Sequence, residues 1–232
     1  LVAEGASVAV CGRDQQRLRN AEASLRGGSG DVLALRADVA RPEDLATFVE
    51  AAAARWGRID GVVHNAGRAA AGTIEVVDDA TWASDIDLKL MAAVRLTRLA
   101  LPALRASKGA VLFTLAMAAK APGGSSEPSS VTRAAGMALM KALSNELAPD
   151  GIRVNAVLIG LIESGQWVRA AEASGTELGR FYERSAQGAG IPLRRFGRAQ
   201  EFADLGSFLL SARASYLTGT AINLDGGLSP AV

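Results

Sequence analysis

Short apolar runs alternate with longer amphipathic segments along the whole chain, and this alternation constrains the fold most. Six runs rich in Val, Leu and Ile have the continuous apolar character of strands buried on both faces. The segments between them carry Ala, Leu, Glu and Arg at three- and four-residue spacing, which predicts helices. The expected strands are 6–11, 32–35, 61–64, 110–114, 154–159 and 221–224, and the expected helices are 14–25, 42–54, 82–107, 131–148 and 200–211.

Strands that alternate with helices, without Pro- or Ser-rich linkers or an internal repeat, predict right-handed crossovers and a parallel sheet covered on both faces. We therefore expect a doubly wound α/β fold in one domain, 1–232, with its ligand beyond the carboxyl ends of the strands. The least regular stretch, 160–191, carries Trp167, Phe181 and Tyr182. We expect it to be a helical lid whose aromatic side chains form an apolar substrate pocket; the alternative is a surface excursion that only packs.

Composition narrows the classes of partner. The 25 Lys and Arg residues nearly balance 24 Asp and Glu residues, so the net charge of +1 does not favour nucleic acid or a membrane surface. A single cysteine, Cys11, and a single histidine, His64, exclude an intrachain disulfide and a His/Cys metal cluster. The longest apolar stretch, 109–119, is shorter than the roughly 18 residues of a membrane span. We expect a cytoplasmic protein that acts on a small molecule.

Two strand ends carry residues suited to a dinucleotide. Gly12 and Arg13 follow the first expected strand, where an acidic residue would hold ribose hydroxyls and a basic residue accommodates a 2′-phosphate. Arg13 therefore favours NADP over NAD, unless it is only a solvated arginine. Asp38, followed by Val39, ends the second strand and can accept hydrogen bonds from an adenine amine and loop amides. The alternative for Asp38 is a helix N-cap before Pro42.

Three longer segments point to a known family. They are Gly57-Arg-Ile-Asp-Gly-Val-Val-His-Asn-Ala-Gly67, Glu146-Leu-Ala-Pro-Asp-Gly-Ile-Arg-Val-Asn155 and Tyr216-Leu-Thr-Gly-Thr-Ala-Ile-Asn-Leu-Asp-Gly-Gly227. Together they resemble the short-chain dehydrogenase/reductase family, over essentially all 232 residues. The resemblance implies a Rossmann-like, three-layer fold. It also implies that Asn65, Ala66 and Gly67 line the adenosine side of the cofactor, and that Gly160 and Ile162 lie in the loop beside the nicotinamide.

The family's opening strand and its glycine-rich turn, Thr-Gly-x-x-x-Gly-x-Gly, are absent from this numbering. The segment Leu1-Val-Ala-Glu-Gly-Ala-Ser7 resembles the end of the helix that follows that turn. In the family this strand is central, so its loss would leave backbone groups of two neighbouring strands unpaired. We therefore expect a truncated chain.

The family's catalytic tetrad of Asn, Ser, Tyr and Lys is replaced at every position. The resemblance puts Lys89, Ala116, Ser129 and Arg133 at those four places, and no Tyr-x-x-x-Lys occurs anywhere in the chain. An aliphatic hydroxyl ionises less readily than a phenol, and an arginine does not release its proton near neutral pH. We take Ser129, Arg133 and Lys89 as candidate catalytic residues because they occupy tetrad positions.

Other titratable groups have competing interpretations. Lys89 in a dry pocket would act as a base or nucleophile, but it would otherwise be a solvated or salt-bridged lysine near Asp85 and Asp87. We expect His64 to be a hydrogen-bonded structural residue, and Glu163 to tether its loop or to act as a general acid.

Two functions follow. The first is an NADP(H)-preferring reductase or dehydrogenase of a small carbonyl or alcohol, with an atypical site. The second is a nonredox or catalytically inactive protein of the same fold that binds a nucleotide or another small molecule, in which case cofactor binding itself is in doubt. By the resemblance we expect a homotetramer or homodimer, formed through 82–106, 131–147 and the tail 225–232.

Overall fold

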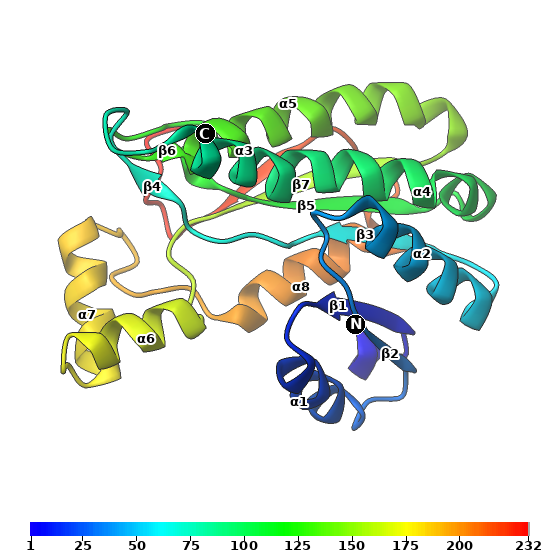
Figure 1. Ribbon diagram of the computed structural model, residues 1–232, viewed down its shortest axis with the longest axis horizontal. Helices are drawn as coiled ribbons and strands as arrows, with labels where there is room; N and C mark the ends of the chain where they lie inside the picture. The colour runs from blue at the N-terminus through cyan, green and yellow to red at the C-terminus, as the bar shows by residue number, and fades with distance from the viewer. Residues whose placement is uncertain (232) are drawn as a thin grey trace.

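The computed structural model describes residues 1–231 and shows three layers, with parallel strands between two layers of helices (Figure 1). The four-stranded sheet has the order β3-β5-β7-β8, and a second parallel sheet contains β1 and β2. This arrangement confirms the α/β fold predicted from the alternating pattern. The strands are β1 Val8–Gly12, β2 Val32–Arg36, β3 Gly61–His64, β5 Ala110–Ala116, β7 Arg153–Ile159 and β8 Ala221–Leu224.

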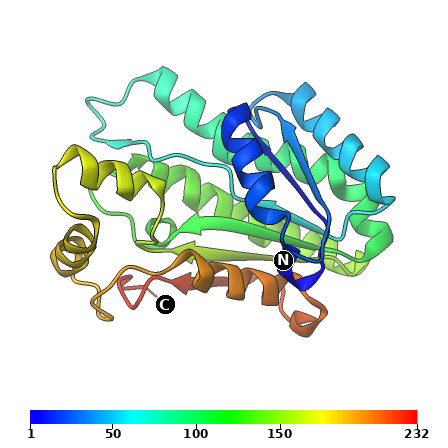
Figure 2. The same cartoon turned by 90° about the horizontal axis from the view of Figure 1, so that it is seen from below.

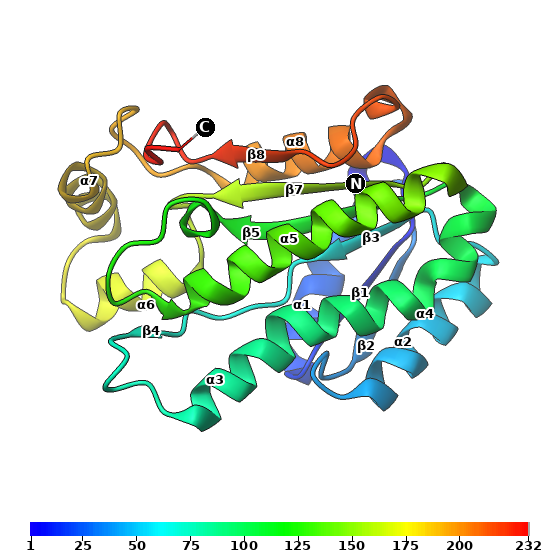
Figure 3. The ribbon, with the colours of Figure 1, turned by 90° about the horizontal axis from the view of Figure 1, so that it is seen from above.

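Helices cover both faces. On one face α4 (Ala92–Ser107) and α5 (Ser129–Leu147) lie over the four-stranded sheet, and α2 (Pro42–Trp56) packs beside α4 (Figure 3). On the opposite face lie α1 (Gln15–Leu25) and α8 (Ala199–Leu210) (Figure 2). Within the described residues, no helix is both long and apolar enough to cross a membrane.

One expected helix is interrupted. The segment predicted as a continuous helix over 82–107 consists of α3 (Asp79–Ile86), a π-helical turn (Asp87–Met91) and then α4. A π turn accommodates one extra residue per turn, and such turns occur often at functional sites. The structure also contains a short antiparallel ribbon of β4 (Ala71–Gly72) and β6 (Glu127–Pro128), which the sequence pattern did not predict.

The segment 160–191 is largely helical, as expected. It contains α6 (Gly165–Ala173) and α7 (Leu178–Ala189). Both helices lie past the carboxyl ends of β5 and β7, where the strand arrows point (Figure 3).

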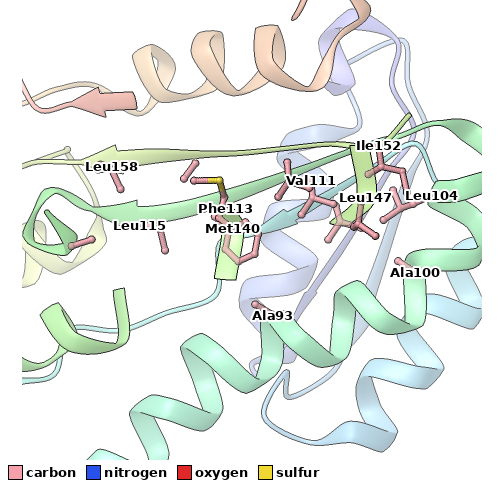
Figure 4. Close-up of a cluster of buried hydrophobic side chains, with 14 residues drawn as sticks. Ala93, Ala100, Leu104, Val111, Phe113, Leu115, Met140, Leu147, Ile152 and Leu158 are labelled. Atoms are coloured by element: carbon pink, nitrogen blue, oxygen red, sulfur yellow. The ribbon is translucent and has the colours of Figure 1, made fainter. Parts of the chain in front are cut away.

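The main core lies between the four-stranded sheet and the helices α4 and α5 (Figure 4). Continuous apolar strands supply side chains to both sheet faces, because successive residues point in opposite directions. Leu112 therefore packs into a smaller cluster with Leu209 of α8, whereas its neighbour Phe113 belongs to the main core. The main core is formed by Val62, Ala93, Ala100, Leu104, Val111, Phe113, Leu115, Ala119, Met140, Leu147, Ile152, Val154, Ala156 and Leu158.

A cavity of about 950 Å³ separates the two parallel sheets. Among the described residues, β1 pairs only with β2, and β3 pairs only with β5. The facing edges of β1 and β3 therefore border the cavity, which extends to α2 and α4.

Candidate active site

The π-helical turn carries Lys89, and the structure surrounds this residue with polar partners. Lys89 Nζ lies 2.6 Å from Asp85 Oδ1, one turn back along the helix. The same nitrogen donates a hydrogen bond of 2.6 Å to Ser129 Oγ. The side chains of Lys89 and Asp85 are 2% and 0% exposed, so this ion pair is withdrawn from solvent. The salt-bridged interpretation of Lys89 is confirmed, with Asp85 as its partner, and the solvated one is wrong.

Asp85 is held from its other side by α5. Thr132 Oγ1 donates a hydrogen bond of 2.7 Å to Asp85 Oδ2, and both side chains are buried. A buried carboxylate is stable only with a charge partner and hydrogen bonds, and Lys89 and Thr132 provide them. From the sequence, Asp85 was expected only as a charge near Lys89. Its full burial had no signal in the local sequence.

Ser129 is the first residue of α5 and connects that helix to the loop after β3. Its Oγ accepts hydrogen bonds from Lys89 Nζ and from the backbone N–H of Ala70, at 3.1 Å. Its own N–H donates to the carbonyl oxygen of Ala70 at 3.2 Å. The β4–β6 ribbon joins the same two segments of chain, so the position of the Ser129 hydroxyl is set by backbone pairing on both sides.

Arg133 lies one turn further along α5 and reaches toward β5 and β3. Its Nη1 donates a hydrogen bond of 2.6 Å to the carbonyl oxygen of Thr114. A Cβ atom at Gly67 would lie 2.7 Å from Arg133 Nη2, so the absence of a side chain there makes room for the guanidinium. No carboxylate of the described residues lies within ion-pair distance of Arg133. Burial lowers the pKa of Arg133, but a guanidinium still stays charged near neutral pH.

The pKa of Lys89 lies below its ordinary value. Burial is the main cause, and the positive charges of Arg133 and Arg68 act in the same direction. The carboxylate of Asp85 opposes them but does not cancel them. Lys89 therefore releases its proton more readily than a surface lysine does.

The predicted cofactor residues Arg13 and Asp38 meet at the ends of β1 and β2. Arg13 Nη1 lies 3.8 Å from Asp38 Oδ2, and the Arg13 side chain is 72% exposed. A second arginine, Arg36, donates from Nε to the carbonyl oxygen of Arg13 at 3.1 Å. Arg36 was not predicted from the sequence, although it is the last residue of β2 and a basic residue at a strand end is a usable signal.

Asp38 does not cap a helix. The N-cap residue of α2 is Arg41, and Asp38 Oδ1 instead accepts a hydrogen bond from the backbone N–H of Ala40 at 3.0 Å. The N-cap alternative is therefore wrong. Gly12 ends β1 beside Arg13, and Val39 follows Asp38.

The large cavity brings together several residues predicted from different strand ends. Val39, Asn65, Ala66, Lys89 and Arg133 all line it. These residues follow β2 and β3 or belong to the π turn and α5, so the cavity connects the predicted adenosine side with the tetrad positions.

Gly160 and Ile162 lie elsewhere, beyond the end of β7. A Cβ atom at Gly160 would lie 2.7 Å from Asp225 Cβ, so this glycine allows the chain after β7 to pack against the tail. Ile162 forms an isolated parallel bridge with Gly197. Val232, the last residue of the predicted assembly tail, lies outside the described residues.

The aromatic residues of 160–191 pack on one another. Phe196, only 2% exposed, lies 5.5 Å from Trp167 and 4.9 Å from Tyr182 between ring centroids. A cavity of about 340 Å³ beside them is lined mainly by charged side chains, including Glu163 and Arg194. The rings form a small core of their own, and Tyr182 and Phe196 also line this cavity, so the apolar substrate pocket stays a prediction.

His64 is a structural residue, as expected. Its Nε2 lies 2.9 Å from Thr97 Oγ1, and its ring packs against Phe113 with 4.5 Å between centroids. Burial lowers the pKa of His64 to about 3, which keeps the ring neutral at physiological pH.

Comparison with known proteins identifies the family. The family model described as Enoyl-(Acyl carrier protein) reductase matches residues 1–229. Human Dehydrogenase/reductase SDR family member 4 is 32% identical over 234 residues, which cover 98% of this chain and 80% of that protein.

Two solved structures are similar in fold and sequence. L-sorbose reductase from Gluconobacter frateurii, complexed with NADPH and L-sorbose, has a TM-score of 0.94 at 33% identity, covering 100% of this chain and 90% of that one. A short chain oxidoreductase from Pseudomonas aeruginosa PAO1 that contains an atypical catalytic center, in its NADPH-bound form, has a TM-score of 0.91 at 34% identity. This match covers 97% of this chain and 88% of that one. The chain therefore belongs to the short-chain dehydrogenase/reductase family.

Proposed function

We propose that this protein is an NADP(H)-dependent reductase or dehydrogenase of a small carbonyl or alcohol substrate, with an atypical catalytic site. The observation that carries the proposal is the contact between Ser129 and Lys89, the second of which lines the large cavity. Two residues at tetrad positions, 40 positions apart in the chain, form a polar pair in which a proton is available. Membership of the family supports hydride transfer as the step that accompanies this proton transfer.

The residues at the ends of β1 and β2 suit a dinucleotide phosphate. Arg13 and Arg36 bring two guanidinium groups to the ends of β1 and β2, and guanidinium groups there favour a 2′-phosphate over free ribose hydroxyls. Both solved structures described above hold NADPH. Gly12, Val39, Asn65, Ala66 and Gly67 would line the adenosine side, and Gly160 and Ile162 the nicotinamide side.

At the reacting end, the bound cofactor would supply or accept a hydride, and the protein would handle the proton. Arg133 would donate hydrogen bonds to the ribose and stay charged throughout. Lys89 and Ser129 would move the proton. The helices of 160–191 would close over the substrate as a lid, and two-fold contacts through α4 and α5 would form a homodimer or homotetramer.

The test measures binding and turnover separately. Fluorescence titration with NADPH and NADH should show tighter binding of NADPH, and the joint substitution of Arg13→Ala and Arg36→Ala should remove most of that preference. Arg26→Ala, which removes an exposed arginine paired with Glu22, is the matched control. Tighter binding of NADH would overturn the cofactor assignment.

Turnover is then followed over a panel of small aldehydes and ketones. Oxidation of NADPH by at least one of them is the expected result, and Arg133→Ala should abolish it. Binding of NADPH without any turnover would favour the nonredox function, for which the replacement of all four tetrad residues is the supporting observation.

A further inference from the structure

We propose that Ser129 Oγ is the proton donor to the substrate, that Lys89 resupplies the proton, and that Asp85 is the positioning residue that aims Lys89 at Ser129. This assignment rests on the proposed oxidoreductase function and names the groups through which the proton of that reaction reaches the substrate. It also includes a residue, Asp85, that lies at none of the tetrad positions.

The hydrogen bonds of Ser129 leave its proton free. A hydroxyl oxygen has two lone pairs and one hydrogen. Both lone pairs of Ser129 Oγ are used, by Lys89 Nζ at 2.6 Å and by the N–H of Ala70 at 3.1 Å. Among the described residues no acceptor takes the Ser129 hydrogen. The hydroxyl is therefore arranged to donate, and two donors stabilise the negative charge that develops on its oxygen as the proton leaves.

Lys89 is placed to replace that proton. Its Nζ donates a hydrogen bond to Ser129 Oγ at 2.6 Å and forms an ion pair with Asp85 Oδ1 at 2.6 Å. The distance to Ser129 is short enough for direct transfer between the two heavy atoms. Lys89 also lines the large cavity, and water that enters this cavity would return the proton to a side chain that is otherwise only 2% exposed.

Asp85 keeps Lys89 both charged and oriented. Thr132 fixes Asp85 Oδ2, so the carboxylate presents its other oxygen to Lys89. No other cation lies within ion-pair distance of Asp85 among the described residues. When Lys89 loses a proton to Ser129, Asp85 is left as an uncompensated buried carboxylate, which drives Lys89 to take up a new proton.

The proton balance closes for the reduction of a carbonyl. A cofactor held at the site would supply the hydride to the carbonyl carbon, and the Ser129 hydroxyl proton would go to the carbonyl oxygen to give the alcohol. One N–H proton of Lys89 moves to Ser129 Oγ and restores the hydroxyl. Lys89, now neutral, regains its proton from solvent, and oxidation of an alcohol runs the same steps in reverse.

The first test removes the donor. Ser129→Ala should lower kcat by about 100-fold or more while the Kd for NADPH stays within about threefold, because a positioned acid contributes about 10²–10⁴ in rate. Ser129→Thr keeps the hydroxyl and should recover most of the activity. Ser126→Ala removes a nearby hydroxyl that hydrogen-bonds Ser130 and is the matched control. Full activity in Ser129→Ala would overturn the assignment.

The second test follows Lys89 itself, without cofactor. The chain has four lysines, so ¹³C-labelled lysine gives a resolvable set of Cε signals whose titration reports each pKa. Lys89 should titrate below the other three, and Asp85→Asn should lower its pKa further by about 1–3 units. In the pH profile of kcat for reduction, the alkaline limb should move to lower pH by the same number of pH units, because reduction needs protonated Lys89.

The outcomes separate the two proposals. If Lys89 titrates like the other lysines, or if the kcat limb does not follow its pKa, the relay is wrong. If the protein neither binds nor oxidises NADPH, the proposed function is wrong, whatever Lys89 does. If Asp85→Asn fails to fold, the double variant Asp85→Asn/Lys89→Met removes both charges together. This double variant should bind NADPH and lose turnover. Turnover at the wild-type rate in the double variant would refute the relay.

Discussion

His64 should make the stability of this protein depend on pH in a range where few other groups titrate. Burial lowers its pKa from 6.5 to about 3 in the folded protein, and it is the only histidine of the chain. Below pH 6.5 the unfolded chain therefore binds a proton at this residue that the folded protein does not. Because the unfolded state binds more protons in this range, the free energy of unfolding rises with pH. The contribution of His64 to stability is fully present above pH 6.5 and decreases as the pH falls below 6.5.

The size of the effect follows from the two pKa values. Each pH unit below 6.5 removes about 1.4 kcal/mol, so lowering the pH from 7.5 to 5 should cost about 2 kcal/mol. Unperturbed Asp and Glu side chains titrate near pH 4, so they contribute little above pH 5. The slope between pH 5 and 6.5 therefore reports mainly on His64.

Urea denaturation at several pH values measures this slope. The wild-type protein should lose stability from pH 6.5 to 5, and His64→Gln, which cannot titrate, should show a nearly flat profile whatever its absolute stability. Thr97→Ser retains the hydroxyl that contacts the imidazole and should retain the slope. A flat wild-type profile, or an undiminished slope in His64→Gln, would refute the argument.

Three further substitutions test the packing. Leu104→Ala removes a fully buried side chain and should cost about 2–5 kcal/mol in a denaturant titration; a loss under about 1 kcal/mol would contradict the core assignment. Gly160→Ala places a Cβ 2.7 Å from Asp225 Cβ and should lower the free energy of unfolding by about 1–3 kcal/mol in the same assay. An unchanged denaturation midpoint would mean that the tail can move away from residue 160 without cost. Gly67→Ala should displace the Arg133 guanidinium and weaken NADPH binding in a fluorescence titration, whereas unchanged affinity would show that Arg133 can shift without loss.

The strands were predictable because their signal is local. A strand between two layers of helices must be apolar on both faces, so β3 and β8 have the same bounds in the sequence pattern and in the structure. Helix periodicity located α1 and α8 to within one residue for a similar reason, since an amphipathic face repeats along the chain. The π turn was not predicted within the expected helix 82–107, because Asp87–Met91 contains no residue that interrupts a helix.

The candidate site was predictable only where a residue stands at a motif position. The family pattern indicated Ser129, Arg133 and Lys89 as candidates, and the ends of the strands indicated Arg13 and Asp38. Their contacts were not, because each joins distant segments of the chain.

The sequence by itself therefore determined the order of strands and helices and the family, since both are written in local patterns and motif spacing. Only the tertiary structure decided which partners Ser129, Lys89 and Asp85 have. Thr132 meets Asp85 across 47 positions, and Ser129 meets Lys89 across 40. Burial turns these contacts from ordinary polar pairs into a charged, water-excluded group, and burial depends on the packing of α5 against the π turn.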